Sequence, residues 1–121
     1  MVKGTGIDLT EVERIKNNME NSRFLQKVYS ERELEYLKMR KFNPQTAAGM
    51  FAAKEAAAKC LGTGFSKFGP RDIEILKDEM GKPTVVLNNN ALKRAEELNI
   101  KIIHISITHT NDIAAAQCVA E

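Results

Sequence analysis

The stretch from Gln45 to Leu61 constrains this fold more than any other part of the chain, because alanine occupies seven of its seventeen positions. Alanine is the strongest helix former, so the stretch predicts a long helix. Asn43-Pro44 precedes it, and proline is tolerated at the first helical position. Gly62 follows it and predicts its end. Because side chains this small allow close packing, we expect this helix to lie at the centre of the fold.

The first third of the chain predicts a strand and two short helices. Residues 2–9 are typical of a strand, in which the glycines at positions 4 and 6 allow another backbone to approach closely. Thr10 with Glu13, and Ser30 with Glu33, have the spacing of a capping box, in which a hydroxyl and a glutamate bind the free N–H groups at a helix start. They predict helices from about residue 11 to 20 and from about residue 31 to 40.

The second half of the chain predicts mainly strands. Residues 72–78 and 83–87 flank a Glu-Met-Gly-Lys turn and are expected to form a hairpin. A helix from the asparagines at 88–90 to about residue 98 and strands at 101–109 and 113–120 complete the chain. We therefore expect one α+β domain over residues 1–121, with a helical first half whose long central helix packs on a mostly antiparallel sheet.

Composition narrows the class of protein without indicating a reaction. The 121 residues, 43% hydrophobic and 28% charged, are typical of a soluble globular domain. No apolar run approaches the roughly 20 residues of a membrane span. A net charge of +2 and a pI of about 8.6 are too mild for a dedicated nucleic-acid-binding protein. Two cysteines are too few for a disulfide scaffold, which favours a cytoplasmic protein.

Glu55 and Lys59 lie one turn apart on the predicted central helix and share a face. Such a pair is most often a surface ion pair that contributes only about 0.3–0.5 kcal/mol. Here alanines surround it, which would partly desolvate both charges. The Gly62-Thr63-Gly64 segment that follows is either a helix end with a flexible loop or a cradle of backbone N–H groups for phosphate oxygens.

Asp8 is a lone acid between apolar residues. It is either a surface residue before a helix or, with Glu55, one of two carboxylates of the kind that bind Mg²⁺. On the predicted strand 101–109, His104 and Ser106 share one face, and His109 lies on the other face or in the turn. The polar face suits phosphate or ribose contacts, although plain solvent exposure is the commoner role of such a face.

Positive charge is concentrated in residues 14–41, which hold eight Lys or Arg and four Glu, a local balance of +4. Arg14 and Arg23 lie on or just after the first predicted helix. The region is either a solvated, mildly basic surface or a docking surface for an acidic partner, since complementary charge raises association rates.

Three segments together carry a resemblance to a known family. They are Gly6-Ile7-Asp8-Leu9 with Arg14 downstream, Phe51-Ala-Ala-Lys54-Glu55-Ala-Ala-Ala-Lys59 followed by Gly62-Thr63-Gly64, and Ser106-Ile107-Thr108-His109. In motif order, spacing and length, essentially the whole chain resembles the bacterial holo-(acyl carrier protein) synthases, the small 4′-phosphopantetheinyl transferases. Cys60 stands where alanine is more familiar, a difference that is not expected to affect the chemistry.

The resemblance implies a reaction. The 4′-phosphopantetheine arm of coenzyme A would pass to a serine of apo acyl carrier protein, in fatty acid biosynthesis, leaving adenosine 3′,5′-bisphosphate. Asp8 and Glu55 would bind Mg²⁺ and, together with Lys59, would be the catalytic residues. Glu55 would take the serine proton directly or through a bound water. Lys59 would stabilise the phosphoryl oxygens or the departing bisphosphate.

The resemblance also assigns residues to the substrate and to the partner. Coenzyme A would contact Gly62, Thr63 and Gly64, then Gly81, Lys82 and Pro83, and finally His104, Ser106 and His109. Arg14 and Arg23 would meet the acidic helix of the carrier protein. The family implies a homotrimer with sites between adjacent subunits.

Two other classes of function remain open. The first is a coenzyme A or nucleotide-binding module without catalysis, which would need the Gly62–Gly64 loop and basic side chains but not Asp8 and Glu55 together. The second is an interaction protein that docks a partner through its basic helix and ignores coenzyme A and metal.

Overall fold

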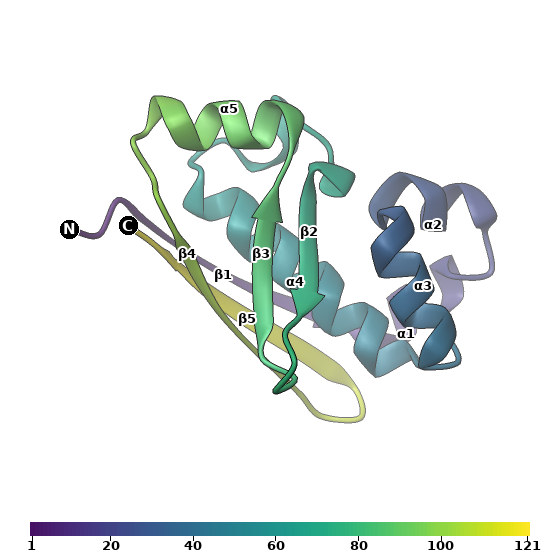
Figure 1. Ribbon diagram of the computed structural model, residues 1–121. Helices are drawn as coiled ribbons and strands as arrows, with labels where there is room; N and C mark the ends of the chain where they lie inside the picture. Colours follow the sequence, from purple (N-terminus) through teal and green to yellow (C-terminus); the bar gives the residue numbers. More distant parts are fainter.

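The structure, a computed structural model, describes residues 1–121 (Figure 1). Its helices and strands follow the order β1 (Gly4–Glu11), α1 (Val12–Asn18), α2 (Ser22–Val28), α3 (Glu31–Met39), α4 (Pro44–Cys60), β2 (Ile73–Lys77), β3 (Pro83–Leu87), α5 (Asn89–Glu97), β4 (Ile103–His109) and β5 (Ile113–Ala120). Single 3₁₀ turns at Gly64–Ser66 and Pro70–Asp72 lie between α4 and β2. The α+β class and the helical first half are confirmed.

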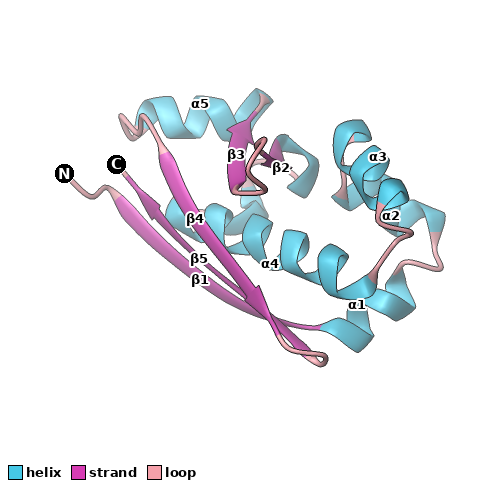
Figure 2. Cartoon of the chain, turned by 60° about the horizontal axis from the view of Figure 1, so that its bottom comes forward, coloured by secondary structure: helices cyan, strands magenta, loops and turns pink.

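The strands form two antiparallel sheets. One has three strands in the order β1-β5-β4, and the other is the β2–β3 hairpin. Helix α4 contacts all three strands of the larger sheet and also β2. Figure 2 shows α4 between the larger sheet and the hairpin, with α1 to α3 gathered at one end. The long helix is therefore central, as its composition predicts.

Two glycines bring β1 against α4. A methyl group on Gly4 would overlap the carbonyl oxygen of Cys60, and one on Gly6 would overlap that of Ala56. Both positions therefore require the absence of a side chain, as the sequence predicts. Alanines complete the contact, since Ala52 and Ala56 are fully buried. This close packing sets Asp8, two residues after Gly6, beside the helix.

The structure corrects the predicted start of the first helix. Strand β1 continues to Glu11, which precedes α1 without a side-chain capping bond. Thr10 is a buried strand residue that pairs with Ala114 of β5. Pairing with β5 therefore keeps Thr10 in the strand, although its local sequence predicts a helix cap. The other capping box, Ser30 with Glu33, is confirmed at the start of α3.

One face of the larger sheet is left uncovered. Helix α4 covers one face of the sheet, and no element covers the opposite face (Figure 2). Large apolar side chains of β1 and β5 are exposed on that opposite face. Ile7 is 67% exposed, Leu9 71% and Ile113 37%. Exposed apolar surface of this kind marks an interaction site. No helix of the structure is long and apolar enough to span a bilayer.

Candidate functional site

A stripe of side chains along α4 faces the edge strand β1. It consists of Phe51, Glu55 and Lys59, spaced four residues apart and therefore aligned on one side of the helix. The ammonium nitrogen of Lys59 lies 3.5 Å from Oδ1 of Asp8 and donates a 2.8 Å hydrogen bond to the carbonyl oxygen of Ile7. The structure thus brings together the three residues that the sequence predicts as catalytic.

Two carboxylates lie close together in this site. Partial burial raises the pKa of Glu55, and the nearby negative charge of Asp8 raises it further. The positive charges of Lys59 and Arg14 oppose that rise without cancelling it. Burial and the neighbouring carboxylate therefore disfavour the ionised form of Glu55. A cation bound between the two carboxylates would favour it.

The donor set fits Mg²⁺ better than a softer metal. Asp8 and Glu55 are oxygen donors, and Mg²⁺ commonly takes one or two carboxylates and fills its remaining positions with water and substrate phosphates. The structure contains no cluster of three or more His, Cys, Asp or Glu side chains that could enclose an ion. An open pair of carboxylates next to Lys59 can hold a hard cation that also binds a phosphate ester.

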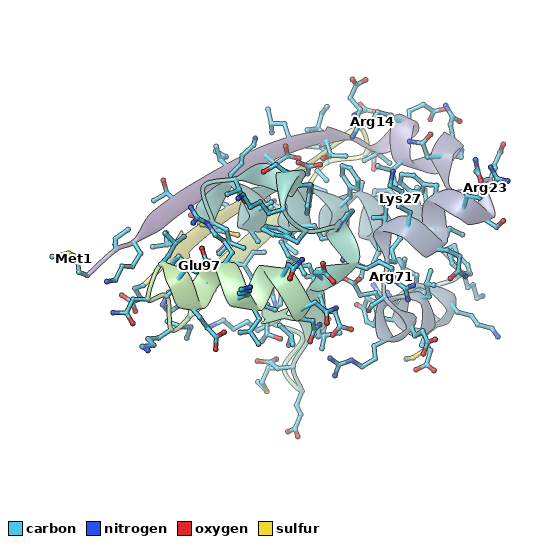
Figure 3. The ribbon with its side chains drawn as sticks, turned by 90° about the horizontal axis from the view of Figure 1, so that it is seen from above. Met1, Arg14, Arg23, Lys27, Arg71 and Glu97 are labelled. Carbon is cyan, nitrogen blue, oxygen red and sulfur yellow. The ribbon has the colours of Figure 1, made fainter.

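Arg14 lies next to the carboxylate pair. Its guanidinium sits 5.3 Å from the ring centre of Phe51, one turn before Glu55 on α4, and Phe51 stacks on Phe24 of α2. These contacts fix Arg14 beside the site. Arg23 is exposed on α2, and Figure 3 shows Arg14, Lys27 and Arg23 at the same end of the molecule.

A cavity of about 490 Å³ lies between β3, β4 and the end of α5. Lys82, Pro83, His104 and Ser106 line it, so the structure brings these four predicted substrate residues together. Nε2 of His104 lies 3.0 Å from a carboxylate oxygen of Glu121, which lowers the pKa of that carboxyl. Gly81 is in the exposed turn before Lys82, with a φ of 83° that favours glycine.

His109 lies apart from that cavity, in a second pocket of about 240 Å³. Arg40 from the end of α3 and Lys77 from β2 line the same pocket. Burial lowers the pKa of Lys77, and the charge of Arg40 lowers it further. Two cations held this close attract an anion. Sequence reasoning missed Arg40 and Lys77 as site residues, because they come from elements far apart in the chain.

The loop after α4 lies in neither cavity. Gly62 and Gly64 have φ values of 78° and 56°, which favour glycine. The side chain of Arg94 lies near Gly62, and its Nε donates to the carbonyl oxygen of Leu61. This bond satisfies a carbonyl group that has no partner within α4. The hydroxyl of Thr63 donates within the loop to the carbonyl oxygen of Gly64. Gly62 therefore follows the end of α4, as the sequence predicts.

Lys54 departs from the other charged residues of its motif. Its side chain is fully buried and forms a 2.6 Å ion pair with Glu33 of α3, away from Asp8. By contrast, the side chain of Lys59 is half exposed. Strong desolvation of an ammonium therefore occurs at Lys54 and not at Lys59. Cys60 is buried in the hydrophobic core.

Together, a carboxylate pair that fits a hard cation, a half-exposed lysine beside it and a basic pocket define a small α+β protein built to handle a phosphate-bearing ligand. Residues 4–118 match the model of the 4′-phosphopantetheinyl transferase superfamily. The chain belongs to this family.

Named relatives extend over the full chain. This chain is 48% identical over 122 residues to a holo-[acyl-carrier-protein] synthase of Clostridium botulinum, and the match covers all of this chain and 98% of the relative. The crystal structure of the Neisseria meningitidis holo-[acyl-carrier-protein] synthase superposes with a TM-score of 0.91 at 31% identity, covering 100% of this chain and 99% of that one. The Helicobacter pylori synthase in complex with coenzyme A has a TM-score of 0.85 at 28% identity, covering 97% and 99%.

Proposed function

We propose that this protein transfers the 4′-phosphopantetheine group of coenzyme A to a serine of apo acyl carrier protein and releases adenosine 3′,5′-bisphosphate. This is the reaction of a cytoplasmic enzyme of fatty acid biosynthesis. The observation that carries the proposal is the Asp8–Glu55 carboxylate pair beside Lys59, in a chain whose relatives are holo-[acyl-carrier-protein] synthases. A binding module without catalysis has no need of two carboxylates that repel each other.

Asp8 and Glu55 would hold Mg²⁺. When bound, the ion supplies neutralising charge to the pyrophosphate of coenzyme A. Glu55 accepts the proton of the serine hydroxyl, either directly or through a water molecule. The serine oxygen then bonds to the phosphorus that carries the pantetheine. The bond from that phosphorus to the bridging oxygen breaks, and the bisphosphate leaves with the electron pair.

Lys59 stabilises the charge that develops on the phosphoryl oxygens or on the leaving bisphosphate. It is suited to this because its ammonium is half exposed and its partners are one carboxylate oxygen and one backbone carbonyl oxygen. A charged donor held at this point lowers the energy of the transition state more than that of the bound substrate.

Coenzyme A would occupy the two cavities and the loop after α4. The 490 Å³ cavity at Lys82, Pro83, His104 and Ser106 offers apolar and polar walls suited to the adenosine. The pocket at His109, with its two like-charged neighbours, suits a phosphate group. The Gly62–Gly64 loop would contact the remaining phosphates through its backbone.

Sites shared between neighbouring copies would unite these parts. In one chain, β1 carries Asp8 at one edge of the larger sheet, and β4 lines the large cavity at the other edge. The uncovered apolar face of the same sheet needs a protein partner. We propose a homotrimer, because contacts between unlike surfaces close into a ring and set one edge of each subunit against another edge of its neighbour.

The carrier protein would dock at the end of the molecule formed by α1 and α2. Arg14 and Arg23 lie there, in the stretch with a +4 balance. Because Arg14 is also held beside Glu55, a carrier bound to it would bring its serine to the carboxylate pair.

One assay tests the proposed function. Apo acyl carrier protein is incubated with the protein, coenzyme A and Mg²⁺, and released adenosine 3′,5′-bisphosphate is measured by chromatography. We expect release only when the carrier is present, no release after chelation of the metal, and recovery when Mg²⁺ is added back. Release that survives chelation would contradict the metal role of Asp8 and Glu55. Binding of coenzyme A without any release would support the non-catalytic alternative.

A further inference from the structure

Thr10 holds one oxygen of Asp8. Its hydroxyl donates a 2.7 Å hydrogen bond to Oδ2 of Asp8, two residues earlier on the same face of β1. Thr10 is only 2% exposed, so water cannot easily replace this bond. The hydroxyl makes no other side-chain hydrogen bond in the structure, and the capping role that its sequence context predicts is absent.

The two oxygens of Asp8 therefore have different partners. Oδ2 accepts from Thr10, whereas Oδ1 lies 3.5 Å from the ammonium of Lys59 on α4. A hydrogen bond to one oxygen restricts rotation of the carboxylate about its own axis. It leaves the second oxygen directed at the helix that carries Glu55. A charge-assisted bond of this kind is shorter and stronger than one between neutral groups.

We propose that Thr10 is a positioning residue that orients the Asp8 carboxylate for a divalent cation. This inference rests on the proposed metal role of Asp8 and Glu55. Partners that fix the orientation of a ligating side chain typically change metal affinity by about 10- to 100-fold when removed. Thr10 fits that role because its own position is fixed by burial and by pairing with Ala114.

Substitutions at this position separate orientation from packing. Thr10→Val keeps the branched shape and the strand preference but removes the hydroxyl. Thr10→Ala removes it in a smaller side chain and serves as a second hydroxyl-free variant. Thr10→Ser retains the hydroxyl and is the matched control.

The test measures Mn²⁺ binding to the full chain by electron paramagnetic resonance, without coenzyme A or carrier protein. We expect the Mn²⁺ dissociation constant to rise about tenfold or more in Thr10→Val and Thr10→Ala and to stay within about threefold of wild type in Thr10→Ser. Coenzyme A binding measured in a chelator should be the same in all four proteins. Wild-type Mn²⁺ affinity in Thr10→Val, or an equal loss in Thr10→Ser, would overturn the inference.

The variant Asp8→Asn distinguishes a failure of the proposed metal site from a failure of the positioning role of Thr10. If Asp8→Asn binds Mn²⁺ as tightly as wild type, the proposed metal site is wrong, and the role of Thr10 is wrong with it. If Asp8→Asn loses Mn²⁺ while Thr10→Val keeps it, the metal site stands and only the positioning role is overturned.

Discussion

At the scale of single residues, the site depends on Glu55, whose surroundings disfavour its charged form. Glu55 is partly buried next to Asp8, and both effects favour its protonated form. A fold gains nothing from this arrangement, whereas a base or a cation ligand does. The motif spacing predicted that Glu55 and Lys59 share a helix face. It could not predict the approach of Asp8, which depends on the packing of β1 on α4 through Gly4 and Gly6.

Glu55→Gln should separate activity from stability. Without a base, we expect the rate to fall by about 10²- to 10⁴-fold. The folded-state pKa of Glu55 lies above its usual 4.5, so the folded protein loses stability as the pH rises from about 4.5 through that raised value. A neutral glutamine side chain carries no such cost. In the absence of metal, the variant should therefore melt at a higher temperature than wild type at pH 8 and show no such gain at pH 4.

Thermal unfolding followed by circular dichroism at the two pH values provides the check. Glu96→Gln, at an exposed glutamate of α5, is the control and should change neither rate nor melting temperature. A lower melting temperature of Glu55→Gln at pH 8 would show that the carboxylate stabilises the fold.

Arg14→Glu should affect the carrier more than the coenzyme. Reversing this charge removes an attraction for an acidic helix, so we expect KM for the carrier protein to rise about tenfold or more, while KM for coenzyme A changes little. Lys93→Glu reverses an exposed charge on α5 and should leave both values unchanged. Steady-state kinetics with each substrate varied in turn measures this. An equal rise in both KM values would argue against docking at Arg14.

At the scale of helices and strands, a buried polar network joins α3, α4 and β2. Lys54 pairs with Glu33, and Glu33 also accepts from the backbone N–H groups of Ser30 and Ile75. Glu74 of β2 accepts from Ser30 and from Arg32, which lowers its pKa to about 2. This network fixes the hairpin and α3 on the central helix, and both elements line the basic pocket.

Lys54→Met should destabilise the protein strongly. It leaves the carboxylate of Glu33 buried without its charged partner, which typically costs about 3–5 kcal/mol. Adding Glu33→Gln removes the unpaired charge, so the double variant should unfold at a higher denaturant concentration than Lys54→Met alone. Urea unfolding of the single and double variants measures both effects. A single variant as stable as wild type would show that the pair contributes nothing to the fold.

Local signals explain which elements the sequence could predict. The bounds of α4 follow from Asn43-Pro44 and Gly62, and the start of α3 follows from its capping box. Thr10 shows where such signals fail, because its pairing with Ala114 joins residues about a hundred positions apart. The basic pocket was out of reach for the same reason, since Arg40, Lys77 and His109 meet only in the folded chain.

At the scale of the whole molecule, one chain holds the parts of the proposed site at separate places. The carboxylate pair lies beside β1, and the cavities that suit coenzyme A lie along β4, at the other edge of the same sheet. The exposed apolar face between those edges suits a contact with another copy. We therefore expect phosphopantetheine transfer to need Asp8 and Glu55 from one subunit and the basic pocket from its neighbour.

Mixed trimers of two damaged variants test whether the site is shared between subunits. Glu55→Gln damages the carboxylate pair, and Lys77→Glu combined with His109→Glu damages the basic pocket. Each alone is expected to modify little apo acyl carrier protein in the time that the wild-type protein needs to modify it fully. The two variants are co-expressed with different tags and purified through both tags, so that each trimer contains both variants. About a third of the sites in these mixed trimers should be intact. In any such ring, only one of the interfaces joins an undamaged carboxylate pair to an undamaged pocket.

The measurement is the mass of the carrier protein after incubation with coenzyme A and Mg²⁺. We expect a gain of one phosphopantetheine with the mixed trimers and little or no gain with either variant alone over the same time. Mixed trimers that leave the carrier unmodified, under conditions in which the wild-type protein modifies it fully, would contradict a site shared between neighbours. A wild-type protein that adds no phosphopantetheine to an authentic apo carrier would contradict the proposed function itself.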